Sequence, residues 1–97
     1  MITTINEFKK HHDYKIYHRT YGSAIDEVSK YLDIIKYDYN KDDVINAYID
    51  GFFKPKEGET KKDHFQLYKG DKKVIEHLHV QIYNRGDAGF ELNMYIN

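Results

Sequence analysis

The sequence has no cysteine and no tryptophan, and it has a single proline. Without cysteine, the chain forms no disulfide framework and no zinc site built from thiolates. No apolar run approaches the roughly 20 residues that a membrane-spanning helix needs, and residues 1–10 lack the apolar stretch of a signal peptide. We therefore expect a soluble, cytoplasmic protein.

Neither sign of charge dominates the chain. Fifteen Lys and Arg residues face sixteen Asp and Glu residues, which gives a net charge of −1, and this balance argues against direct binding of nucleic acid by bulk charge. The abundant Lys, Ile, Tyr and Asn residues have AT-rich codons. We expect a source such as a low-GC bacterium, or a phage or mobile element within one.

Length and composition predict one folded domain that spans residues 1–97. The chain is 40% hydrophobic and 15% aromatic, which is enough apolar surface for a folded core of modest size.

Helical spacing of apolar residues predicts three helices. Each follows a residue whose side chain caps helix N-termini, namely Thr4, Ser23 and Asn40. The predicted helices cover residues 5–11, residues 24–36 and the stretch between Asn40 and Gly51.

Alternating apolar and polar residues predict one early strand and three late ones. The early strand covers residues 14–21, and the late strands lie in "DHFQLYK", "KVIEHLHVQIY" and "GFELNMYI". Gly70-Asp71 suits a tight hairpin turn, which predicts His64 opposite His77. The second hairpin is expected to pair Ile82 with Phe90.

The predicted order, α-β-α-α-β-β-β, indicates an α+β fold in which an antiparallel sheet packs helices on one face. One set of alternating strand residues is apolar and is expected to face those helices. Its members are Phe65, Leu67, Val74, Leu78, Val80, Ile82, Phe90, Leu92, Met94 and Ile96.

The other set of strand residues is rich in Tyr, His, Asn and Gln. Tyrosine supplies a large contact area at a low entropic cost and a hydroxyl group for specificity, so this set predicts a protein-binding surface. A loop or helix covering the same face is the alternative. The predicted binding residues are Tyr68, His77, His79, Gln81, Tyr83, Asn93 and Tyr95.

Acidic residues outnumber basic ones between Asp26 and Asp50. They are either the solvated sides of two helices or a surface that competes for a basic groove on a nucleic-acid-handling protein, which complementary charge would help the chain to find. The second interpretation adds to the predicted binding residues Asp33, Asp38, Asp42, Asp43 and Asp50.

A metal site is the main alternative for the histidine-rich strand. A His-x-His pair on a strand projects both imidazoles on one side, and His64, His77 and His79 together have the ligand types of an open zinc site. Glu91 would then act as the base of a metal-dependent hydrolase, or the cluster would sense metal. "DYNKDD" also resembles the start of a calcium loop, although helix capping by Asn40 explains the same residues.

These observations favour a small non-catalytic protein without a cofactor that masks the surface of a protein partner. We expect an inhibitor encoded by a phage or mobile element, of which an anti-CRISPR-like anti-defence protein would be one case. A homodimer through the exposed sheet face is a further possibility.

Overall fold

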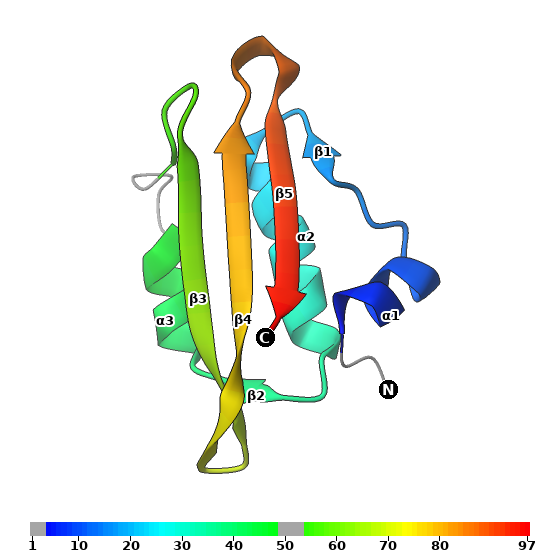
Figure 1. Ribbon diagram of the computed structural model, residues 1–97, viewed down its shortest axis with the longest axis vertical. Helices are drawn as coiled ribbons and strands as arrows, with labels where there is room; N and C mark the ends of the chain where they lie inside the picture. Colours follow the sequence, from blue (N-terminus) through cyan, green and yellow to red (C-terminus); the bar gives the residue numbers. More distant parts are fainter. Residues whose placement is uncertain (1–3, 49–53) are drawn as a thin grey trace.

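The computed structural model describes residues 4–48 and 54–97. It contains a five-stranded antiparallel sheet with helices against one face, which confirms the α+β class and the predicted order (Figure 1). None of the described helices is long and apolar enough to cross a membrane. The elements are α1 (Ile5–His11), β1 (Tyr17–His18), α2 (Tyr21–Ile34), β2 (Asp38–Tyr39), α3 (Lys41–Tyr48), β3 (Thr60–Lys69), β4 (Lys72–Asn84), η2 (Gly86–Ala88) and β5 (Phe90–Ile96).

The strands lie in the order β1-β5-β4-β3-β2, so the long strand β4 is central and the two-residue strands β1 and β2 are at the edges. Figure 1 shows α2 and α3 behind the sheet and α1 beside the edge that carries β1. The strand β2 is an addition to the predicted order. It pairs Tyr39 with Leu67 of β3.

The first strand is shorter than predicted because α2 begins earlier. Thr20, in extended conformation, caps α2 by accepting a hydrogen bond from the Ser23 backbone N–H at 3.1 Å. The prediction of Ser23 as the capping residue is therefore wrong, and Tyr21 belongs to the helix. The caps Thr4 and Asn40 are confirmed, since each accepts from a backbone N–H of its own first turn.

The predicted register of the first hairpin is confirmed beside the turn, where Tyr68 lies opposite Lys73. Beyond a β-bulge between Gln66 and Tyr68 it is wrong by two residues, and His64 lies opposite His79 rather than His77, because the bulge takes extra residues into β4. The predicted register of the second hairpin is also wrong by two residues. Ile82 lies opposite Leu92 rather than Phe90, since the turn between β4 and β5 starts one residue later than expected. A shift of two residues keeps every side chain on its predicted face.

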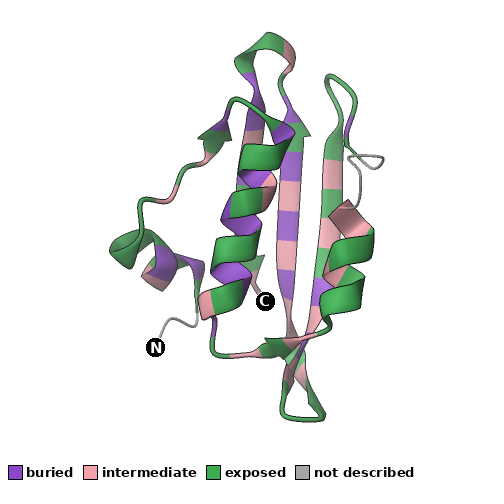
Figure 2. Ribbon diagram, turned by 180° about the vertical axis from the view of Figure 1, so that it is seen from behind, coloured by how far each residue is buried: buried purple, intermediate pink, exposed green. Residues whose placement is uncertain are grey.

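The predicted apolar row is confirmed as the side of the sheet that packs on the helices. Figure 2 shows this buried row along the strands behind α2. From α2, Ala24, Val28 and Tyr31 are fully buried against it. The expected end of the third helix at Gly51 lies outside the described residues.

Candidate protein-binding face

The face of the sheet turned away from the helices is not covered by any described element (Figure 1). We call it the open face. It consists of the alternate strand residues whose neighbours form the core. These residues are Tyr17, Thr60, Lys62, His64, Gln66, Tyr68, Lys73, Ile75, His77, His79, Gln81, Tyr83, Glu91, Asn93 and Tyr95.

One end of the open face is a tyrosine pair held around an arginine. The guanidinium carbon of Arg85 lies 5.7 Å from the ring centre of Tyr17 and 5.8 Å from that of Tyr83. The same guanidinium donates to a carboxylate oxygen of Glu91 at 3.2 Å. Because Arg85 contacts both rings and is itself held, the tyrosines are ordered although Tyr17 is 62% exposed.

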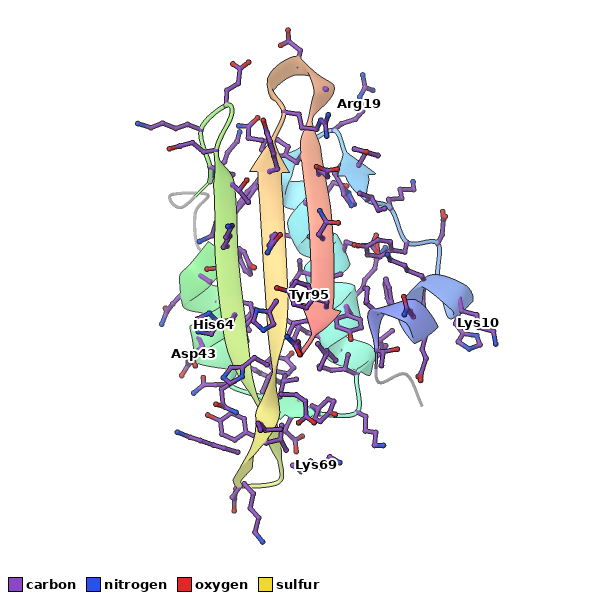
Figure 3. The ribbon with its side chains drawn as sticks, viewed as in Figure 1. Lys10, Arg19, Asp43, His64, Lys69 and Tyr95 are labelled. Carbon is purple, nitrogen blue, oxygen red and sulfur yellow. The ribbon has the colours of Figure 1, made fainter. Side chains whose placement is uncertain are left out.

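The middle of the open face is formed by histidines. The His79 imidazole stacks on the Tyr95 ring with 4.6 Å between ring centres and 5° between planes. His64 and His77 lie beside His79, with ring centres 5.7 to 6.4 Å apart. Figure 3 labels His64 on β3 and Tyr95 on β5 at this position.

The three imidazoles are the residues of the predicted metal site, and the structure brings them together. Within residues 4–48 and 54–97, however, no group of three or more His, Cys, Asp or Glu residues is placed to hold a metal ion. The stacking of His79 on Tyr95 joins the histidines to one tyrosine of the face. The Gln81–Asn93 pair separates this cluster from Tyr83.

The β-bulge forms the other end of the open face. The Gln66 side-chain amide donates to the backbone carbonyls of Leu67 at 2.9 Å and Val74 at 2.8 Å, which fixes the irregular segment. Ile75, which follows on β4, is 88% exposed. Tyr68 is half-buried at the margin of the face, opposite Asp38 of β2.

The structure does not gather the predicted acidic residues on the open face. Asp33, Asp42 and Asp43 are exposed on α2 and α3, which lie on the helix side of the sheet. Asp38 accepts a hydrogen bond from the Gly70 backbone N–H at 2.9 Å, so it supports the β3–β4 turn. Asp43 lines a shallow groove together with His64. The remaining acid, Asp50, lies outside the described residues.

The sequence pattern does not predict Tyr17 and Arg85 as members of the face. Tyr17 comes from a two-residue strand, which carries too little alternation to assign a face. Arg85 follows β4 in a turn, where side chains have no periodicity. The segment "YNRGDAGFE" could have indicated the Arg85–Glu91 contact, because the two residues flank the turn with opposite charges.

Comparisons of the chain with protein-family models, with curated proteins and with solved structures gave no match.

Proposed function

We propose that this chain is a non-catalytic protein-binding protein that inhibits its partner by covering part of that partner's surface with the open face. One observation carries the proposal. The face has no cover among the described elements, yet its aromatic side chains are already held by their neighbours. Exposed aromatic groups that are ordered before binding lose little conformational entropy when a partner arrives.

The composition of the open face favours protein over nucleic acid. Protein interfaces are enriched in Tyr and Arg at their centres, and both residue types are present here. Binding of nucleic acid needs several cations for the phosphates. On the open face Arg85 is paired with Glu91 at 3.2 Å. Lys62 and Lys73 are the lysines that the described strands add, and most of the other side chains are neutral amides or aromatic rings.

Exposed acidic residues on the helix side of the sheet support one class of partner. Asp33, Asp42 and Asp43 are exposed, and within the described part of the chain neither of the two ion pairs involves them. Such charges attract a partner with a basic surface and speed its encounter. The proposal is therefore an inhibitor of a nucleic-acid-handling protein, as expected for an anti-CRISPR-like protein from a phage or mobile element.

Site-specific photo-crosslinking tests which face is used. Benzoylphenylalanine replaces Tyr83 or Tyr95 on the open face, and Ile45 on α3 serves as the control because it is 56% exposed on the helix side. Irradiation in cells of the source organism is expected to give the same crosslinked protein from both open-face positions and none from position 45. The purified partner should then lose activity when the chain is added.

Three outcomes would contradict the proposal. A product from position 45 alone would place the interface on the helix side, and a product containing nucleic acid would change the class of partner. A product of twice the mass of the chain would identify the open face as a homodimer contact.

A further inference from the structure

A second candidate site lies on the opposite side of the sheet. A cavity of about 370 Å³ is enclosed by α1, by the segment that leads from α1 to β1 and by the first half of α2. This volume is within the range of pockets that bind small ligands, which begins at roughly 300 Å³. The cavity is lined by acidic, hydroxyl and aromatic side chains, among them Glu27, Asp26, Ser23, His18, Phe8 and His12.

Glu27 is the unusual residue of this cavity. It lies on the buried side of α2, next to Val28, and is only 5% exposed. Its carboxylate nevertheless makes no hydrogen bond and no ion pair with any described residue. The Glu27 oxygens are not among the fully buried atoms that lack a hydrogen-bond partner. Because Glu27 lines the cavity, a partner for its carboxylate would fit there.

Ser23 of the cavity wall offers a further acceptor, which its contact with His18 fixes. His18 is 5% exposed, and its Nε2 lies 2.8 Å from the backbone carbonyl oxygen of Lys15 while its Nδ1 lies 2.7 Å from Ser23 Oγ. A carbonyl oxygen only accepts, so in the neutral imidazole Nε2 carries the proton and Nδ1 accepts from the Ser23 hydroxyl. The Ser23 oxygen then keeps only its acceptor lone pairs for a ligand.

An aromatic wall completes the cavity. Phe8 and His12 stack with ring centres 4.7 Å apart and planes within 8°. A cation beside an aromatic face is favoured by the charge distribution of the ring. Carboxylate, hydroxyl oxygen and aromatic face together form an environment that suits a positively charged donor of hydrogen bonds.

We propose that this cavity binds a small organic cation with N–H donors, an alkylammonium or a guanidinium group, on the Glu27 carboxylate. A single metal ion fits less well, because Asp26 and Glu27 are neighbours on α2 and project about 100° apart. No group of three ligand residues in the described part of the chain is placed to hold a metal ion.

Two lysines of the chain compete for the same carboxylate. Lys15 and Lys30 also line the cavity, yet both are exposed and neither is ion-paired among the described residues. Two kinds of molecule carry such a cation: a free amine, and a protein that presents a lysine or arginine side chain. The proposed site does not depend on the proposed function of the open face.

Titration of the isotope-labelled full chain, followed by NMR, tests the proposal. The probes are ethylguanidinium and butylammonium, and tetramethylammonium is the control without N–H donors. We expect saturable shifts at Glu27, Ser23 and His18 with the first two probes only. A control variant, Asp42→Asn, lies on α3 outside the cavity and should bind as the natural chain does.

The variant Glu27→Gln should weaken binding about tenfold or more, since charge-assisted hydrogen bonds are lost. Without any probe, the same variant should have nearly the same melting temperature as the natural chain, because glutamine has the shape of glutamate and the carboxylate oxygens are not fully buried. Ser23→Ala changes an exposed residue and should weaken binding by roughly two- to tenfold. This variant tests the site if Glu27→Gln does not fold. Equal binding by both variants and the natural chain, or no saturable shifts at all, would overturn the site.

Capped peptides that contain arginine or lysine distinguish the two sources. Binding at least about tenfold tighter than that of ethylguanidinium would support a protein side chain, because flanking peptide contacts then contribute. Equal affinity would support a free amine. Failure of this site leaves the crosslinking result from the open face unaffected.

Discussion

The two faces of the sheet are built from alternate residues of the same strands, and they differ in what holds their side chains. On the covered face Leu78, Val80 and Ile82 of β4 are fully buried against other apolar groups. On the open face the intervening residues His79 and Tyr83 are held by individual aromatic and cation–π contacts. The first arrangement stabilises the fold. The second leaves aromatic side chains exposed at the surface.

The tyrosines of the chain also differ between the two faces of the sheet. Tyr14 and Tyr21 lie on the helix side, where burial first and a nearby carboxylate second raise the pKa of each to about 12. Tyr83 and Tyr95 on the open face are 36% and 40% exposed. A residue type that is abundant in this chain is therefore largely buried on one side of the sheet and exposed on the other.

Truncation on the two faces of β4 should give the largest difference in stability. Leu78→Ala removes a fully buried side chain and should lower the free energy of unfolding by about 2–5 kcal/mol. Ile75→Ala, at a residue that is 88% exposed, should change it by less than about 0.5 kcal/mol. Urea unfolding followed by circular dichroism measures both, and equal losses would mean that the faces are wrongly assigned.

A glycine substitution should break the attachment of β1, and with it the position of Tyr17. Gly89 has a φ of 92°, and a Cβ there would overlap the backbone carbonyl oxygen of His18. Gly89→Ala should therefore destabilise the fold by about 1–3 kcal/mol. Gly22→Ala is the matched control, since a Cβ at this helical position meets nothing within 4 Å. It should stabilise the chain by about 0.5–1 kcal/mol.

The comparison of Gly89→Ala with the control Gly22→Ala tests whether β1 is attached to β5. Equal melting temperatures for the two glycine variants would show that β1 is not held against β5 as described. In that case Tyr17 would not belong to the open face.

Alkaline pH should unfold the chain through its buried tyrosines. Between pH 10.0, the ordinary pKa of tyrosine, and about 12, the unfolded chain releases phenolic protons that Tyr14 and Tyr21 retain in the fold. The unfolded state then binds fewer protons, so stability is complete below pH 10.0 and falls as the pH rises. The slope is about 1.4 kcal/mol per pH unit for each such tyrosine at most.

Tyrosinate absorbance and circular dichroism should therefore change together over this range. Tyr14→Phe should make the loss of stability with pH less steep, because one of the contributing phenols is gone. If the tyrosinate signal were complete before any loss of structure, the buried tyrosines would be accessible in the fold.

Charge reversal on the helix side should have the smallest effect. Asp42→Lys with Asp43→Lys should slow association with the partner by about three- to tenfold at low salt, because long-range attraction is lost. The dissociation rate should stay nearly constant, and high salt should remove the difference. Stopped-flow measurements give both rates, and a faster dissociation would show that these acids lie within the interface.

The strand pattern predicted which residues share a face, because a period of two fixes this directly. It could not predict the register. Apolar residues recur at every second position, so Ile82 opposite Phe90 and Ile82 opposite Leu92 bury the same set, and the turns decide between them. The early strand was predicted too long, since Thr20 and Ser23 are both good capping residues and only packing selects between them.

The sequence predicts residues of the candidate sites only where they lie in a periodic element. Tyr83, His79 and Tyr95 follow from alternation, and their positions on one face agree with the structure. Tyr17 and Arg85 come from a two-residue strand and a turn, where no period exists. The cavity around Glu27 joins α1, β1 and α2, and its shape depends on tertiary packing that the sequence does not state.

The affinity of a double variant for the crosslinked partner tests the central claim most directly. Tyr83→Ala with Tyr95→Ala removes two contact groups of the open face and leaves the covered face intact, so the variant should fold normally. Isothermal titration calorimetry should show binding at least about 100-fold weaker than that of the natural chain, while Ile45→Ala should stay within about threefold. A double variant that binds as tightly as the natural chain would contradict the account.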